Sequence, residues 1–212
     1  SLGSRPGNTR LISPIPAMNI AIRVKVSHEA GLGHWVRQCH LARALQKSGC
    51  TVTLFPDNYE PLKKSRPPDL TVIPVKNHDA FFDQLPPTVS LVILDIHDTD
   101  AGFILRLRDK VRFVAGFEDL GESRNHLDLL IDCNKAPNEA ERLPQNVTAL
   151  FGEDYSLLAP EYETLSKKSR DFSHEIKKLL VTMGGTDPKK LTLPVVKILL
   201  DINQTLQITA VL

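Results

Sequence analysis

Short hydrophobic runs alternate with longer amphipathic stretches along most of this chain. The runs are rich in Val, Ile, Leu and Phe and are bounded by polar or Pro-containing segments, which is typical of β-strands. They read NIAIRVKVS (19–27), CTVTLFP (50–56), LTVIPV (70–75), LVILDI (91–96), VRFVAGF (111–117), LDLLIDCN (127–134) and VTALFG (147–152). Helical patterns lie between them, at His34 to Lys47, His78 to Gln84, Ala101 to Asp109 and Pro160 to Arg170. This alternation predicts an α/β fold with a doubly wound parallel sheet of Rossmann type.

The pattern breaks at a charged segment and then begins again. SKKSRDFSHEIKK (166–178) is followed by strand LLVTMGG, helix KKLTLPVVKILLDI and strand LQITAVL, which ends at Leu212. One strand–helix–strand unit cannot build a sheet buried on both faces, so we expect a longer protein. The expected organisation is an added or flexible lead (1–17) before a native start at Met18, an N-terminal Rossmann-like domain (18–165), a linker (166–178) and the beginning of a second Rossmann-type domain (179–212).

Composition and charge narrow the class of partner. The 26 Lys and Arg nearly balance the 25 Asp and Glu, so charge gives no reason to expect nucleic acid or an anionic membrane. Cys39, Cys50 and Cys133 are widely spaced and odd in number, which excludes a fully paired disulfide framework and a CxxC metal site. The chain lacks both an apolar run of the roughly 20 residues that a membrane span needs and a signal-peptide stretch. We expect a cytoplasmic protein, whose partners must be argued from its candidate sites.

A glycine turn runs directly into a helix in GLGHWVRQCHLARAL (31–45). Gly31 and Gly33 permit a tight bend and close approach of the backbone to a ligand, and the N–H groups at a helix start favour an anion. His34 and Arg37 share the helix face that emerges at the carboxyl edge of the sheet, where ligands bind in open α/β folds. We predict that His34 and Arg37 both take part in the function of this site. A solvated first turn is the alternative, although exposed cations there oppose the helix dipole by roughly 0.3–1 kcal/mol each.

Acidic side chains follow two of the predicted strands. They are Asp95 and Asp98, which flank His97 after LVILDI, and Glu118 and Asp119 after VRFVAGF. Carboxylates at this edge can bind sugar hydroxyls or orient a histidine. They can equally cap the next helix, with Asp98 or Thr99 as the N-cap. No HExxH or comparable spacing is present, so we do not predict a metal site.

A second glycine loop, MGGTDP (183–188), lies between a predicted strand and a predicted helix. Its possible phosphate donors are Gly184, Gly185 and Thr186. The loop lacks the Gly-Lys-Ser/Thr ending of a Walker motif. The alternative is a capped turn, with Asp187 as N-cap and Pro188 at the first helical position.

Taken together, these motifs resemble one family. GLGHWVRQCHLARAL is similar to the G-x-G-H-x-x-R motif of the UDP-sugar hydrolases of the pseudaminic acid pathway, which are related to spore coat polysaccharide biosynthesis proteins and, more distantly, to the GT-B glycosyltransferase that makes lipid II. FEDLG resembles the acidic loop of the family, and LLIDCN resembles the strand that follows it. GEDYSLLAPEY resembles the hinge segment, and VTMGGTDP resembles the loop that opens the second domain. The order and spacing cover most of Met18 to Pro188. The chain departs from the family at Ala159-Pro160 and in LDIHDTD, which leaves the sugar open.

The resemblance implies a two-domain GT-B architecture that holds the nucleotide mainly in the C-terminal domain. It implies hydrolysis of a UDP-linked amino sugar at the anomeric carbon, in nonulosonic-acid or surface polysaccharide biosynthesis, with no metal and no cofactor. By this resemblance His34 positions or activates the water. The implied substrate-binding residues are Gly31, Gly33, Arg37, Asp95, Asp98, Glu118, Asp119 and Tyr155, and the implied phosphate-binding residues are Gly184, Gly185 and Thr186.

Two other functions stay open at this point. A GT-B glycosyltransferase that uses a related donor differs from a hydrolase only in what reaches the anomeric carbon, an acceptor hydroxyl or water. An acceptor site can be a shallow apolar groove without a motif, so sequence does not separate the two. A binding or folding module without turnover is the third possibility, since a GT-B fold hosts many activities.

Overall fold

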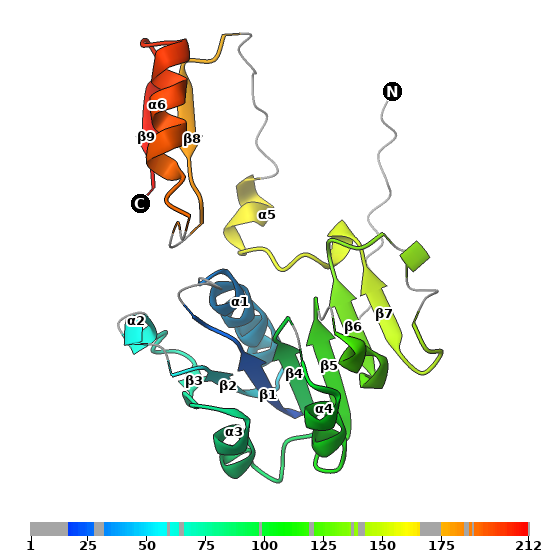
Figure 1. Cartoon of the computed structure of the whole chain (residues 1–212). Helices are drawn as coiled ribbons and strands as arrows, with labels where there is room; N and C mark the ends of the chain where they lie inside the picture. Colours follow the sequence, from blue (N-terminus) through cyan, green and yellow to red (C-terminus); the bar gives the residue numbers. More distant parts are fainter. Residues whose placement is uncertain are drawn as a thin grey trace.

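A seven-stranded parallel sheet forms the centre of the molecule (Figure 1). The structure is a computed structural model that describes residues 17–27, 32–58, 60–63, 66–97, 99–118, 121–136, 138–139, 143–165, 175–184, 187 and 189–211. The strands are β1 (Asn19–Val24), β2 (Thr51–Pro56), β3 (Thr71–Val72), β4 (Leu91–Asp95), β5 (Phe113–Phe117), β6 (Leu129–Asp132) and β7 (Thr148–Phe151). Each lies inside one of the hydrophobic runs, so the seven predicted strands and the α/β fold class are confirmed.

The strand order reverses at a defined point of the sheet. The order is β3-β2-β1-β4-β5-β6-β7, and all six neighbouring pairs are parallel. The chain builds outward from β1 to β3 and then returns to add β4 on the other side of β1. Strand order therefore reverses between β1 and β4, and the carboxyl ends of these two strands flank the crevice where open α/β folds bind ligands.

In the first unit, helices form in each of the predicted helical stretches. They are α1 (Gly33–Lys47), α3 (His78–Gln84), α4 (Ala101–Arg108) and α5 (Glu161–Leu165). Residues 166–170, the rest of the predicted last helix, lie outside the described residues. The sequence did not indicate α2 (Glu60–Lys63), η1 (Glu122–His126) or η3 (Glu153–Tyr155), because such short segments show no helical periodicity. In the described part of the chain α1 is the longest helix, at 15 residues, and no helix has the length and apolarity to cross a membrane.

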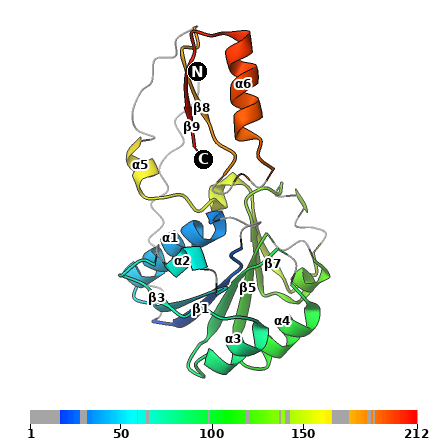
Figure 2. The same ribbon diagram turned by 60° about the vertical axis from the view of Figure 1, so that its left-hand side comes forward.

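Helices cover both faces of the sheet, with α1 on one face and α3 and α4 on the other (Figure 2). Trp35 and Cys39 of α1 are buried with residues of β1 and β2 such as Ile22. The opposite core contains the aromatic side chains of α3 and α4, including Phe81 and Phe103. Strands buried on both faces need apolar side chains at successive positions, which explains why they appear in the sequence as continuous hydrophobic runs.

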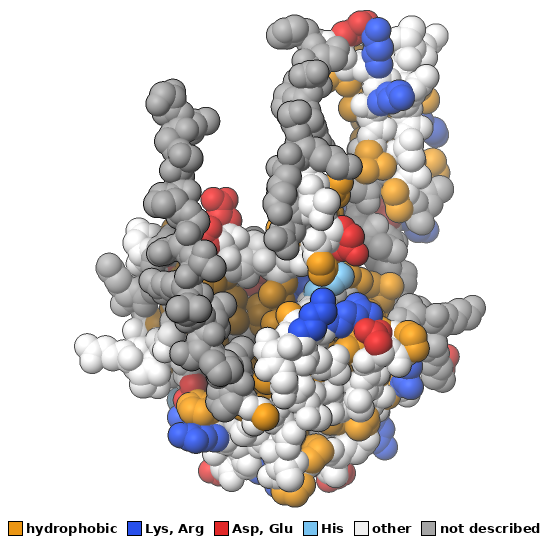
Figure 3. Space-filling model, turned by 180° about the vertical axis from the view of Figure 1, so that it is seen from behind, with side chains coloured by type: hydrophobic (Ala, Val, Ile, Leu, Met, Phe, Trp, Pro, Cys, Tyr) orange, Lys and Arg blue, Asp and Glu red, His pale blue; other side chains and the backbone are white. Residues whose placement is uncertain are grey.

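A second parallel unit follows the charged segment. It consists of β8 (Lys178–Val181), α6 (Thr192–Ile202) and β9 (Gln207–Ala210), and its two strands form a separate sheet. Two strands and one helix leave much of the apolar surface of this unit uncovered (Figure 3). Its exposed apolar side chains include Leu180, Leu193, Ile198 and Ile202.

Helix α6 begins later than the sequence predicts. Its first residue is Thr192 and its N-cap residue is Leu191, so the prediction of Asp187 as N-cap with a helix starting at Pro188 is wrong. The Asp187 carboxylate still accepts from the backbone N–H groups of Leu191 and Thr192, at 2.8 and 2.9 Å. A carboxylate upstream of the helix thus satisfies amide groups that the first turn leaves without partners. Pro188 lies outside the described residues.

Candidate functional site at the carboxyl edge of the sheet

The first turn of α1 meets the carboxyl end of β4 at the crevice. Val24, the last residue of β1, pairs with Asp95, the last residue of β4, so the two strands end at the same level. Ile93 of β4 is buried in the core beneath α1, and Asp95 lies two residues further on, on the same face of the strand. This places a carboxylate beside the first turn of α1, which carries His34 and Arg37.

Asp95 is the centre of the cluster. Its Oδ1 lies 2.7 Å from Nδ1 of His34 and 2.6 Å from Nη2 of Arg37, and its Oδ2 accepts from Arg37 Nε and Gln38 Nε2, each at 2.8 Å. The side chain is only 1% exposed. Protein donors contact both oxygens, an arrangement in which Asp95 can orient the histidine. Its role as a substrate contact stays a prediction.

Electrostatics fix the charges of Asp95 and Arg37. Burial opposes ionisation of Asp95, but hydrogen bonds from Arg37 and His34 outweigh burial and hold the pKa of this carboxyl below its usual value. Burial likewise opposes the charge of Arg37, and the contacts with Asp95 and Glu118 outweigh it, so the pKa of the guanidinium is raised. Both groups are therefore ionised across the physiological range.

The ionised carboxylate selects the tautomer of His34. Arg37 Nη2 also lies 3.0 Å from His34 Nδ1, but the closer Asp95 oxygen is an obligate acceptor, so Nδ1 carries a proton and donates it to Asp95. In the neutral ring Nε2 is then the unprotonated nitrogen. An imidazole held in this way can take a proton at Nε2 from a water molecule or a hydroxyl.

Glu118, directly after β5, joins the cluster from the other side of Arg37. Its Oε1 lies 3.0 Å from Arg37 Nη1 and accepts from Cys133 Sγ at 3.3 Å and Asn134 Nδ2 at 3.2 Å. The backbone of Glu118 has φ of +49°, in the left-handed region that residues other than glycine rarely adopt. Within the described residues no hydrogen bond reaches Oε2, so its predicted role as a substrate contact stays a prediction. Arg37 forms ion pairs with both Asp95 and Glu118 and so links the two carboxylates of the cluster.

His97 completes the group from the loop after β4. Its Nε2 lies 3.1 Å from Nε2 of His34, with the two rings perpendicular and their centroids 4.7 Å apart. Its Nδ1 lies 3.2 Å from the backbone oxygen of Glu118. The sequence placed His97 at this edge but gave no sign of the contact with His34. Gln38, Cys133 and Asn134 were also missed, since each reaches the cluster through tertiary contacts alone. No group of three His, Cys, Asp or Glu side chains in the described ranges is arranged to hold a metal ion.

The two described loop glycines differ in what their backbone requires. Gly33 is the first residue of α1, its φ is not in the left-handed region, and a Cβ built on it would meet no atom within 4 Å. The backbone therefore gives no steric reason for glycine at position 33, and close approach of a ligand stays a prediction. Gly184 has φ of +82°, which does favour glycine.

The remaining described residue of the predicted sugar site, Tyr155, does not join the cluster. Tyr155 is exposed in η3, and no hydrogen bond among the described residues joins it to His34. Gly31, Asp98, Asp119, Gly185 and Thr186 lie outside the described residues.

The N-cap of α4 is Asp100, whose side chain accepts from the N–H of Phe103, so the alternative that placed this cap at Asp98 or Thr99 is wrong. Thr99 instead donates from Oγ1 to the carbonyl of Ile96, at 3.3 Å. A one-residue difference in where the helix begins decides which polar side chain caps it. The caps of α4 therefore do not involve the carboxylates of the His34 cluster.

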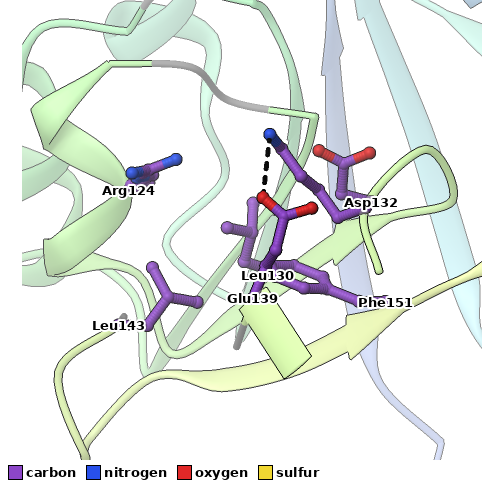
Figure 4. Close-up of a pocket in the computed structure, with 7 residues that line it drawn as sticks. Arg124, Leu130, Asp132, Glu139, Leu143 and Phe151 are labelled. Atoms are coloured by element: carbon purple, nitrogen blue, oxygen red, sulfur yellow. Dashed lines mark ion pairs between the residues drawn. The ribbon is translucent and has the colours of Figure 1, made fainter. Parts of the chain in front are cut away.

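A separate pocket lies over β6 and β7, lined in part by Leu130, Asp132 and Phe151 (Figure 4). Lys135 and Glu139 form an ion pair of 3.4 Å at this pocket. Its volume is about 100 Å³, whereas pockets for small-molecule ligands usually have about 300 Å³ or more. None of the residues of the His34 cluster lines it, and it is too small for a nucleotide-sugar.

Similarity to known proteins is distant. No protein-family model matches the chain. It is 27% identical over 205 residues to the uncharacterized protein MJ1062 of Methanocaldococcus jannaschii, an alignment that covers 92% of this chain and 42% of that protein. It is 24% identical over 180 residues to the spore coat polysaccharide biosynthesis protein SpsG of Bacillus subtilis, covering 82% of this chain and 52% of that protein. The chain thus spans about half the length of the curated relatives it matches.

Proposed function

We propose that this protein hydrolyses a UDP-linked amino sugar at its anomeric carbon and releases UDP, in nonulosonic-acid or surface polysaccharide biosynthesis. The observation that carries the proposal is the contact between His34 Nδ1 and the buried Asp95 carboxylate at the crevice between β1 and β4. The distant similarity to a spore coat polysaccharide biosynthesis protein supports a role in sugar-nucleotide chemistry. The motif GLGHWVR supports the finer assignment to a hydrolase.

Each residue of the cluster has a distinct part in the proposed reaction. A water molecule gives a proton to His34 Nε2 while its oxygen forms a bond to the anomeric carbon. The bond between that carbon and the β-phosphate oxygen breaks, and UDP leaves with the electron pair. Asp95 stabilises the imidazolium that forms, and Arg37 holds Asp95 in place. General-base assistance of this kind typically contributes about 10²–10⁴ in rate.

The nucleotide is assigned to the second Rossmann-type unit. In this proposal residues 18–165 hold the sugar and the reacting atoms, and the domain that begins at residue 179 holds the nucleotide. Gly184, Gly185 and Thr186 donate to the diphosphate. The left-handed backbone of Gly184 supports this role, since such turns present successive N–H groups to an anion.

The test is release of UDP in water alone. A panel of UDP-amino sugars is incubated with the 212-residue chain and with the full product of its gene, with and without sugar acceptors, in H₂¹⁸O. We expect UDP without an acceptor, and ¹⁸O in the sugar and not in UDP, because the proposed reaction breaks the carbon–oxygen bond. ¹⁸O in UDP would contradict attack at the anomeric carbon.

Two further outcomes would replace the proposal. UDP release only in the presence of an acceptor would make the protein a glycosyltransferase. Saturable binding of a UDP-sugar without any turnover would make it a binding module. His126→Gln is a matched control for histidine variants, because His126 is an exposed histidine in η1 and no hydrogen bond among the described residues links its ring to the cluster.

A further inference from the structure

The contact between His34 and His97 requires a proton that neither neutral ring supplies. Nδ1 of His34 donates to Asp95, and Nδ1 of His97 faces a backbone carbonyl, which can only accept, so it also carries a proton. In two neutral rings both Nε2 atoms would then be unprotonated. Two nitrogen lone pairs 3.1 Å apart repel each other, so the observed approach needs one proton between them. The pair in this arrangement carries one positive charge.

The charges around the pair favour this additional proton. Among the described residues, the titratable and charged groups of the cluster are Arg37 of α1, Asp95 of β4, Glu118 after β5 and Cys133 after β6. Two carboxylates contact one guanidinium, which leaves these described groups with one negative charge. Burial raises the pKa of the Cys133 thiol, which is therefore neutral. One proton shared by the two histidines brings the cluster to neutrality, as a partly buried group of charges requires.

We propose that His34 and His97 together hold the water that attacks the substrate. When the shared proton leaves, each ring presents an unprotonated Nε2 to the other. The two lone pairs repel, the rings move apart, and a water molecule that enters between them donates one O–H to each nitrogen, which turns its oxygen lone pairs toward the anomeric carbon. His97 is then a catalytic residue, because it contacts the attacking water. This inference rests on the proposed hydrolysis and assigns to it a second residue.

The chemical step returns the pair to the arrangement seen in the structure. The water oxygen bonds to the anomeric carbon, the bond to the β-phosphate oxygen breaks, and UDP leaves with the electron pair. One water proton moves to His34 Nε2 and the other stays on the new hydroxyl. The imidazolium of His34 then donates to the free Nε2 of His97, which is the proton-bridged pair. His97 is exposed, so the proton can pass to solvent and open the pair for the next water.

The residue at position 97 is tested by two variants and a control. His97→Phe keeps a planar ring without nitrogen, and His97→Gln keeps an acceptor oxygen that can take one O–H of the water. We expect kcat to fall about 10²-fold in His97→Phe and less than about tenfold in His97→Gln, as for loss of one group that accepts a proton or hydrogen bond from the reacting water. KM should stay within about threefold in both, because neither change touches the proposed nucleotide contacts. His126→Gln should match the wild type.

A spectroscopic readout separates proton sharing from a merely structural role. In ¹⁵N-histidine NMR of the 212-residue chain, the Nε2 signals of His34 and His97 should move together in one step as pH falls. In His97→Gln this coupled step should be lost, because position 97 no longer carries an imidazole that can share the proton.

The outcomes distinguish this inference from the proposed function. If the wild type hydrolyses a UDP-sugar but His97→Phe matches it in kcat, or if the two rings titrate independently, the shared-proton inference is wrong and the hydrolase proposal stands. If neither the wild type nor any variant releases UDP, the hydrolase proposal fails and the water-binding role of His97 fails with it.

Discussion

Oδ1 of Asp95 lies within hydrogen-bond distance of both His34 Nδ1 and Arg37 Nη2, so one buried oxygen sets the tautomer of the histidine and neutralises the arginine. Asp95→Asn keeps the shape of the side chain and removes its charge. We expect this variant to lower kcat at least 10²-fold, because the imidazolium loses its counter-charge and the Nδ1 proton loses its obligate acceptor. The measurement is UDP release in water under saturating substrate.

The same variant should also lose stability. Removing one partner of a buried ion pair leaves the other charge uncompensated, and for the partly exposed Arg37 we expect a loss of about 2–4 kcal/mol in the free energy of unfolding. Asp57→Asn provides a control, because Asp57 is paired with the buried Arg23 and should cost a similar amount. Urea unfolding measures both. If Asp57→Asn also lost activity 10²-fold, stability and not chemistry would explain the loss in Asp95→Asn.

The stability that Asp95 contributes should depend on pH in one direction only. Its folded-state pKa lies below the unfolded value of about 3.9, so its contribution is fully present above that value. The contribution is lost as pH falls through the folded pKa. The difference in unfolding free energy between wild type and Asp95→Asn should therefore narrow below about pH 4. A difference that did not narrow there would contradict this assignment.

His34→Ala tests the proposed base directly. We expect UDP release to fall at least about 10²-fold, the contribution of a general base, with the fold intact because the side chain lies at the start of α1 and outside the two hydrophobic cores. Circular dichroism checks the fold, and His126→Gln is the histidine control. Activity within about threefold of wild type would remove His34 from the mechanism.

Gly33 and Gly184 should respond in opposite ways to alanine. Gly33 is helical with open space around it, so Gly33→Ala should keep or raise stability by up to about 1 kcal/mol. Gly184 has a left-handed backbone, so Gly184→Ala should cost about 1–2 kcal/mol. If Gly33→Ala weakens substrate binding without loss of stability, the ligand and not the fold requires this glycine. Unfolding curves and calorimetric titration of a UDP-sugar together decide the point.

Much of this arrangement could be predicted from the sequence, because it depends on local periodicity. Continuous apolar runs located the strands, and the helical spacing put His34 and Arg37 on one face at the carboxyl edge. The parts that sequence could not supply depend on loop geometry. These parts include the left-handed backbone of Glu118, directly after β5, and the approach of His97, in the loop after β4, to His34. The sequence is the same whether His34 and His97 are solvated separately or share a proton.

The last prediction concerns the nucleotide. We expect the 212-residue chain to bind free UDP weakly, although it contains His34. In the proposed arrangement the pockets for uracil and ribose belong to a second Rossmann-type domain, of which β8, α6 and β9 would form the beginning. The MGGT loop can offer only a few N–H groups, each contributing about 0.5–1.5 kcal/mol net, while association costs about 4–15 kcal/mol before any surplus appears. Titration by calorimetry or NMR should show no saturation below about 1 mM, where binding is worth about 4 kcal/mol. Micromolar binding would instead place the nucleotide pocket in residues 18–165, beside His34, and the roles proposed for the two domains would have to be exchanged.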